Sequence, residues 1–168
     1  MARWIALFSQ TGSEIVNLSK LVGRKPDVVC SNNLDKDSWV KGLGNVHVGS
    51  HDELMQILLN TESDALVTLH GYLRIIPPEV VKALPNMYNG HPGLISFYPE
   101  LKGKDPQERA MDYKFIGSVV HKVTEGVDEG KIISQVAYTN RASSVESIYN
   151  TCKQASLNAW VHAMRDIL

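Results

Sequence analysis

The sequence predicts an α/β fold: an open, mostly parallel, Rossmann-like sheet flanked by helices and extended by antiparallel strands near the C-terminus. In the first half, short apolar runs alternate with amphipathic stretches, which is the pattern of β-α-β units. In the second half, two alternating stretches at residues 115–123 and 131–139 follow one another with only a loop between them. The chain has 168 residues, 43% of them hydrophobic and 21% charged, which predicts one domain over residues 1–168.

The first half begins with a buried strand at residues 4–8. The turn Ser9–Ser13 follows, and then a helix that carries Ile15, Val16, Leu18 and Leu21. Proline suits a first helical turn, so a later helix is expected to open at Pro77 and run through Leu84. The other elements predicted here are strands at 27–30, around 46–48 and at 65–69, and a helix over about 51–59.

The second half opens with a short strand at residues 87–89 that runs into His91-Pro92-Gly93. A helix is predicted from about residue 106 to 111, and a long helix closes the chain after the two alternating strands. Ser143 and Glu146 form a candidate capping box for that last helix. Its core-facing stripe at helical spacing is predicted to be Ile148, Cys152, Ala155, Ala159 and Ala163.

Composition argues against several classes of partner. The net charge is −1, from 17 basic and 18 acidic residues, so no global field draws the chain to nucleic acid or to an anionic membrane. The N-terminal apolar run is too short for the core of a signal peptide, and no stretch is long enough to span a bilayer. We therefore expect a cytoplasmic protein. Cys30 and Cys152 form no C-x-x-C pair and are predicted to be buried free thiols.

Asn89 and His91 are the first candidates for chemistry. Residues two apart in an extended segment point to the same face, and Pro92 prevents the segment from continuing as a helix. A carboxamide donor beside an imidazole suits the oxyanion that develops in acyl transfer, and the histidine can also move protons near neutral pH. On spacing alone, a turn with a surface histidine is the favoured alternative.

Asp128 lies between glycines in the loop that separates the two alternating strands. It is either an ordinary turn aspartate or a carboxylate that orients a nearby imidazole and favours its charged form. The loops at strand ends collect at one edge of an open α/β sheet, where ligands bind, and this favours the second interpretation. His121, in a predicted strand, is interpreted as a satisfied strand histidine.

Two further segments are candidate binding sites. The turn Ser9–Glu14 offers backbone N–H groups and hydroxyls that could cradle a phosphate, although a simple N-cap turn is favoured and Glu14 is an awkward charge for an anion site. After the central strand, Gly71 permits close approach of a ligand, and Leu73, Ile75 and Ile76 could line an apolar slot for a flat ring. Ordinary core packing explains that segment equally well.

Taken together, the segments resemble the folate-dependent formyltransferases, over nearly the whole chain and in the right order. The segments that carry the resemblance are Leu7–Ser13, Cys30–Asn33, Leu69–Ile76, Asn89–Ile95, Ser118–His121 and Val127–Gly130. The ordered set is specific, because it includes the Asn-x-His-Pro motif and the interval between its histidine and the aspartate that the family shows.

The resemblance implies a mechanism and a set of site residues. The donor would be 10-formyltetrahydrofolate, used as a co-substrate with no metal. Asn89 and protonated His91 would stabilise the oxyanion, and Asp128 would hold the histidine and an ordered water. The pterin would lie against Leu73, Arg74, Ile75, Ile76 and the loop Thr124, Glu125, Gly126 and Val127. The acceptor would contact Thr11, Gly12, Ser13, Gly71, Pro92 and Lys153.

Within the family, the resemblance is greatest to the enzymes that formylate glycinamide ribonucleotide in purine synthesis, which implies small-molecule substrates and a monomer or homodimer. Other members of the family carry an additional domain, and 168 residues are expected to leave no room for one. Departures at Glu14, at Ser156 and in the segment Leu101–Pro106, with Lys102 and Lys104, concern the acceptor. A different amine, such as an amino sugar nucleotide, therefore stays open as acceptor. So do hydrolysis of formyltetrahydrofolate and folate binding without turnover.

Overall fold

The computed structural model describes all residues from 1 to 168. Its helices and strands, including two short 3₁₀ helices, follow one another along the chain as β1 (Trp4–Phe8), α1 (Ser13–Val22), β2 (Val28–Ser31), η1 (Lys36–Ser38), β3 (Val46–Val48), α2 (His51–Leu59), β4 (Leu66–Leu69), α3 (Pro78–Ala83), β5 (Met87–His91), η2 (Pro99–Leu101), α4 (Pro106–Arg109), β6 (Phe115–Lys122), β7 (Ile132–Thr139) and α5 (Val145–Ile167).

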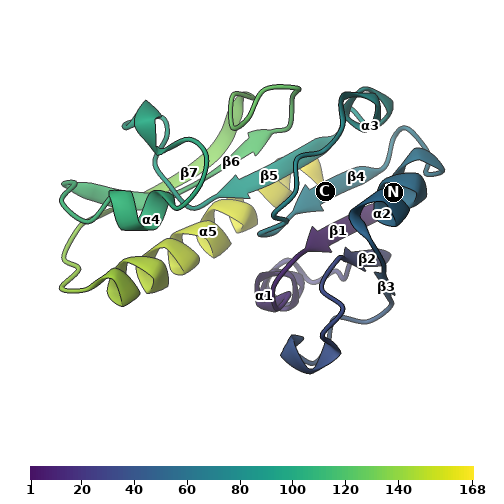
Figure 1. The fold of residues 1–168 in the computed structure, drawn as a ribbon, viewed down its shortest axis with the longest axis horizontal. Helices are drawn as coiled ribbons and strands as arrows, with labels where there is room; N and C mark the ends of the chain where they lie inside the picture. Colours follow the sequence, from purple (N-terminus) through teal and green to yellow (C-terminus); the bar gives the residue numbers. More distant parts are fainter.

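The strands form one seven-stranded sheet in the order β3-β2-β1-β4-β5-β6-β7 (Figure 1). The first five strands in this order pair in parallel, and β6 and β7 are antiparallel. The predicted fold class, a mostly parallel sheet with an antiparallel C-terminal extension, is therefore confirmed. The direction of chain reverses at the junction of β5 and β6, where the sequence places its catalytic candidates.

Alternate residues of the parallel strands pack under different helices. On β1, Ile5 and Leu7 belong to the core beneath α2 and α3. Trp4 belongs to the core that contains Trp160 of α5. In Figure 1, α5 runs along one face of the sheet with α1 close to it, and these two helices contact each other. The sheet is thus covered on both faces, and its carboxyl edge remains for ligands.

Strand register sets the position of the catalytic candidates. Leu7 of β1 pairs with Leu69 of β4, Leu69 pairs with Asn89 of β5, and Asn89 pairs with His121 of β6. The four residues form one row across the sheet, near the carboxyl ends of the parallel strands. This row brings His121 next to Asn89, although the two are 32 positions apart in the sequence.

Several element boundaries differ from the prediction. Strand β5 continues to His91, because Gly90 and His91 pair with Val120 and Val119 of β6. Helix α4 ends at Arg109 rather than near residue 111. Leu21, expected on the buried face of α1, is 60% exposed.

The capping box of α5 is also displaced by one residue. Ser144, in an extended conformation, accepts a hydrogen bond from Ser147 N, and the Ser147 side chain bonds back to the N-cap backbone. The predicted pair Ser143 and Glu146 was wrong, because the helix begins at Val145 and only Ser144 lies at the N-cap.

The two cysteines are buried and free, as predicted. Burial raises the pKa of both the Cys30 and the Cys152 thiol to about 11. None of the helices combines the length and the apolar character that a membrane crossing needs.

Candidate active site

Asp128 lies between two histidines. Its Oδ2 is 3.2 Å from Nδ1 of His91, and its Oδ1 is 3.2 Å from Nε2 of His121. The backbone N–H of Gly103 donates a third contact to Oδ2, at 3.0 Å. All three side chains are largely buried, with 6% of His91, 9% of Asp128 and 3% of His121 exposed. One carboxylate therefore fixes two imidazoles at the edge of the sheet.

Local structure explains how these residues meet. Asn89 and His91 are two apart on β5, as the alternation predicts, and His121 lies opposite Asn89 on β6. Asp128 belongs to the loop between β6 and β7 and has a φ of 53°, in the left-handed region. Aspartate tolerates this conformation better than most residues, and it turns the carboxylate back towards the strands.

The Asn89 amide reaches the same centre. Its Nδ2 lies 3.4 Å from Nε2 of His121, and this is the only hydrogen-bond contact of the side chain. The His121 ring is in turn held by a 2.9 Å bond between its Nδ1 and the Lys122 carbonyl. The amide of Asn89 thus has spare donor capacity for a developing oxyanion.

The loop that contains η2 closes one side of the site. The Leu101 carbonyl accepts a 2.8 Å hydrogen bond from Nε2 of His91, and Gly103 N reaches Asp128. The loop is gathered by the Arg109 guanidinium, which donates to the carbonyls of Lys102 and Lys104 at 3.1 and 2.7 Å, and also to those of Glu100 and Leu101. A single arginine therefore positions the backbone that touches both His91 and Asp128.

Electrostatics divide the charge unequally. Burial lowers the pKa of the His91 imidazole below its ordinary value of 6.5, and the nearby Asp128 charge only opposes this shift. For Asp128, burial acts to raise the pKa, but the bond from His121, the influence of His91 and the amide of Gly103 together lower it below 3.8. Burial thus disfavours the charged form of His91, whereas the contacts around Asp128 favour its ionised form.

This arrangement suits acyl transfer. The Asn89 amide can donate to an oxyanion, and the Nδ1 of His91 can take up a proton beside a carboxylate that stabilises the resulting charge. The protonated His91 that the resemblance implies stays a prediction: burial disfavours its charged form, and the nearby Asp128 carboxylate favours it.

Several apolar side chains of the predicted pterin site are exposed. Leu73 is 68% exposed and Ile75 is 72% exposed, whereas Ile76 is buried in the core. Val127, in the loop that carries Asp128, is 49% exposed. Lys82 of α3 and Glu125 are 3.4 Å apart, which links that loop to the helix following the 73–76 segment. The two predicted halves of the pterin site thus belong to neighbouring parts of the fold.

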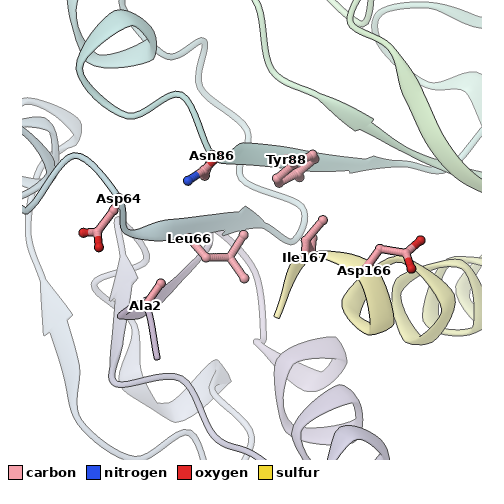
Figure 2. Close-up of a pocket in the computed structure, with 7 residues that line it drawn as sticks. All are labelled: Ala2, Asp64, Leu66, Asn86, Tyr88, Asp166 and Ile167. Carbon is pink, nitrogen blue, oxygen red and sulfur yellow. The ribbon is translucent and has the colours of Figure 1, made fainter.

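A cavity of about 230 Å³ lies away from this site, at the opposite end of the parallel strands (Figure 2). Leu66, Tyr88 and Ile167 gather near its centre, and Asp64 and Asp166 lie towards its two ends. It contains none of the predicted site residues.

The predicted acceptor residues are only partly brought together. Thr11 and Ser13 are exposed in the turn before α1, and Gly12 between them is buried with a φ of 71°. Glu14 Oε2 accepts a 2.7 Å hydrogen bond from the Ser156 hydroxyl, so the two departures from the family pattern touch each other. Lys153 is exposed on α5, as are Lys102 and Lys104 on the η2 loop.

Sequence reasoning missed three contributors. His121 satisfies its strand position through Lys122, as expected, but it also binds Asp128. The role of Arg109 and the contact of Glu14 with His70 were not anticipated. An explicit antiparallel pairing of residues 87–91 with the strand at 115–123 would have placed His121 opposite Asn89. No comparable signal marks Arg109.

Comparison with known proteins agrees with this geometry. A mostly parallel sheet with an amide, an imidazole and a carboxylate at its carboxyl edge is an arrangement compatible with an enzyme of the acyl-transfer class. The family model described as formyl transferase matches residues 10–164, and the chain belongs to this family.

Solved structures of the family have the same fold. The phosphoribosylglycinamide formyltransferase of Anaplasma phagocytophilum is 27% identical, with a TM-score of 0.81 over 98% of this chain and 85% of that one. The corresponding protein of Streptococcus pneumoniae has a TM-score of 0.83 at 23% identity and covers 98% of both chains.

Curated relatives have two different activities in their names. The formyltetrahydrofolate deformylase of Escherichia coli is 30% identical over 122 residues, which is 70% of this chain. The human trifunctional purine biosynthetic protein adenosine-3 is 34% identical over 108 residues, 62% of this chain and 10% of that protein. The chain spans only 42% of the length of the deformylase.

Proposed function

We propose that this protein transfers the formyl group of 10-formyltetrahydrofolate to a primary amine. The observation that carries the proposal is the Asp128 carboxylate, held between His91 and His121 beside the amide of Asn89. The exposed side chains of Leu73, Ile75 and Val127 offer an apolar surface for the pterin ring.

The proposed reaction uses these residues in two steps. The amine nitrogen attacks the formyl carbon, and the carbonyl oxygen becomes an oxyanion that accepts a hydrogen bond from Asn89 and is stabilised by the positive charge that His91 gains with the proton. His91 takes up the amine proton at Nδ1, beside Asp128. The bond from the formyl carbon to the folate nitrogen then breaks, and that nitrogen receives the proton. His91 and Asp128 act as one coupled pair in this transfer.

Glycinamide ribonucleotide is the acceptor we propose first. Its support is the likeness to the phosphoribosylglycinamide formyltransferases, one of them 27% identical over nearly the whole chain. With this acceptor the protein would serve purine synthesis on small molecules in the cytoplasm. We propose no part for a metal or a nucleic acid.

Hydrolysis is the second candidate, with water in place of the amine. The likeness to formyltetrahydrofolate deformylases at 30% identity favours hydrolysis. Asn89, His91 and Asp128 would serve either reaction.

The deciding experiment is an assay with 10-formyltetrahydrofolate and glycinamide ribonucleotide, run beside an amine-free control. Formylated product that depends on the amine supports transfer, whereas formate released equally fast without any amine supports hydrolysis. Single replacements of Asn89, His91 and Asp128 are tested in the same assay with folate binding measured separately. Near-wild-type turnover in all three variants would contradict the proposed site.

A further inference from the structure

A second polar cluster lies on the α1–α5 face of the sheet. The indole N–H of Trp4 donates to the Thr68 hydroxyl at 2.9 Å, and Thr68 contacts Nε2 of His70 at 2.9 Å. Nδ1 of His70 lies 2.8 Å from Oε1 of Glu14, whose Oε2 accepts from Ser156 at 2.7 Å. Residues from two strands and two helices are therefore linked through His70 into one hydrogen-bonded cluster around the Glu14 carboxylate.

Hydrogen-bond accounting gives this chain a direction. The indole N–H of Trp4 can only donate, so Thr68 accepts it and gives its own proton to Nε2 of His70. The imidazole then donates through Nδ1 to Glu14, and Ser156 donates to the other carboxylate oxygen. In this assignment each polar side-chain atom of the cluster has a partner, and each carboxylate oxygen of Glu14 accepts one hydrogen bond.

The cluster lies close to the reacting centre. The His70 ring packs on the indole of Trp160, with 4.5 Å between ring centroids. A side chain at Gly90 would place its Cβ 2.6 Å from Nε1 of that same indole, and Gly90 lies between Asn89 and His91. Strands β1 and β5 are separated by two strand spacings, roughly 10 Å. That is the span of a small acceptor molecule.

Glu14 also has capacity left for a ligand. An ionised carboxylate offers about four acceptor positions, and only two are used by His70 and Ser156. The side chain is 25% exposed, whereas that of His70 is 1% exposed, so the spare positions face outward. No lysine or arginine forms an ion pair with Glu14. Its charge therefore acts on whatever approaches the neighbouring turn at Thr11 and Ser13.

We propose that Glu14 determines which acceptors this enzyme takes. Glu14, held by His70 and Ser156, accepts hydrogen bonds from hydroxyl or ammonium groups of the acceptor and excludes phosphate from the Thr11–Ser13 turn. The inference rests on the proposed formyl transfer and specifies its acceptor side. An acceptor with both ribose hydroxyls and a phosphate would then place the hydroxyls, not the phosphate, at Glu14.

The first test measures the binding of inorganic phosphate to the wild-type protein and to Glu14→Gln by ³¹P NMR titration. The amide is nearly isosteric with the carboxylate, so the variant is expected to fold with a similar Tm. Removing the like charge should strengthen phosphate binding by roughly tenfold or more. Equal phosphate affinity in wild type and Glu14→Gln would overturn the proposal.

Two control variants separate charge from structure. Glu146→Gln changes the same residue type at the same helical position, the second residue of α5, and Glu146 is exposed. It should leave phosphate affinity at the wild-type value. Ser156→Ala removes one bond to Glu14 but keeps its charge, so phosphate should stay excluded. Strengthened phosphate binding in either control would count against Glu14 as the selecting charge.

The second test uses a matched pair of acceptors, glycinamide ribonucleotide and the same riboside without its phosphate. Glu14→Gln should raise the ratio of kcat/KM for the phosphorylated acceptor over the riboside by roughly tenfold. An unchanged ratio would overturn the selection proposed here. If no variant formylates either acceptor, the proposed transfer itself fails, while the phosphate titration still decides the role of Glu14.

Discussion

Asp128 is the residue on which the proposed chemistry depends most. Its carboxylate contacts His91 and His121 and receives the amide of Gly103, so it sets the position of two rings and one loop. Its left-handed backbone conformation is part of this geometry, because it directs the side chain back over the strands. A neutral amide at this position would keep the shape but could not stabilise a positive charge on His91.

We therefore predict that Asp128→Asn lowers kcat by roughly 100-fold or more, the scale of a lost contribution to general acid–base catalysis. The dissociation constant for 10-formyltetrahydrofolate should change little, because the apolar surface is intact. Steady-state kinetics and a separate folate titration check this. Asp112→Asn, at an exposed position, is the matched control. A variant that loses folate affinity but keeps its turnover would contradict the assignment.

At this scale, the sequence predicted what depends on local spacing. Asn89 and His91 are two apart in an extended segment, so their shared face follows from strand geometry. Asp128 required the family resemblance, because nothing local distinguishes it from a turn aspartate. The contact of His121 with Asp128 depends on strand pairing and on the loop path, which single-residue patterns do not encode.

Among the elements, the η2 loop and Arg109 depend on each other. The loop has only a short 3₁₀ turn of its own, and Arg109, the last residue of α4, donates hydrogen bonds to its carbonyl groups. The side chains of the loop itself do not fix its conformation. The guanidinium, with its planar set of donors, supplies that reason.

Replacing Arg109 with Gln should therefore loosen the loop and misplace Leu101 and Gly103 relative to His91 and Asp128. We expect kcat to fall by roughly 10- to 100-fold, because small misplacements at a reacting centre have effects of this size. Amide hydrogen exchange across residues 100–105 should become faster in the same variant. Arg141→Gln changes an exposed arginine elsewhere and should alter neither quantity. Unchanged exchange with reduced kcat would show that Arg109 acts by another route.

The start of α5 allows a direct test of the corrected helix boundary. Ser144→Ala removes the N-cap acceptor for Ser147 N and should reduce the free energy of unfolding by about 1 kcal/mol. Ser143→Ala, one residue earlier, should have an effect near zero. Urea denaturation of both variants measures the difference. A larger loss in Ser143→Ala would restore the boundary that the sequence predicted.

The elements predicted correctly are those with a strong repeating pattern. Fully apolar runs such as Trp4–Phe8 and the stripe on α5 reflect burial, which the composition of each segment already contains. The extension of β5 to His91 and the exposed Leu21 depend instead on partners from distant segments. Boundaries therefore carry more error than the existence of each helix or strand.

Across the whole molecule, the residues of the proposed chemistry and those of the proposed acceptor selection lie on opposite faces of one sheet. The amide, the imidazoles and Asp128 extend from β5, β6 and their loops, whereas Glu14, His70 and Ser156 lie between the sheet and helices α1 and α5. Trp160 packs closely against the backbone of Gly90, which lies between Asn89 and His91 on β5. This separation explains why the sequence indicated the reaction more clearly than the acceptor. The residues proposed to contact the acceptor can differ between relatives while Asn89, His91 and Asp128 stay the same.

The buried His91–Asp128 pair should also make stability depend on pH. Burial lowers the pKa of His91 in the folded protein below 6.5, so on acidification the unfolded chain binds a proton before the folded one does. Stability is therefore complete above about pH 6.5 and is lost as the pH falls towards the folded pKa of His91. Asp128, whose pKa is lowered below 3.8, adds a loss in the same direction at more acidic pH.

We predict that the free energy of unfolding, measured by urea denaturation, decreases between pH 7.5 and pH 5 in the wild-type protein. His91→Gln should show a smaller decrease over that interval, because no imidazole remains to be charged in the buried site. His162→Gln, at an exposed position on α5, should keep the wild-type pH dependence. Equal acid losses in the wild type and in His91→Gln would mean that another group governs the response. In that case, the resting charge assigned to the active site would need revision.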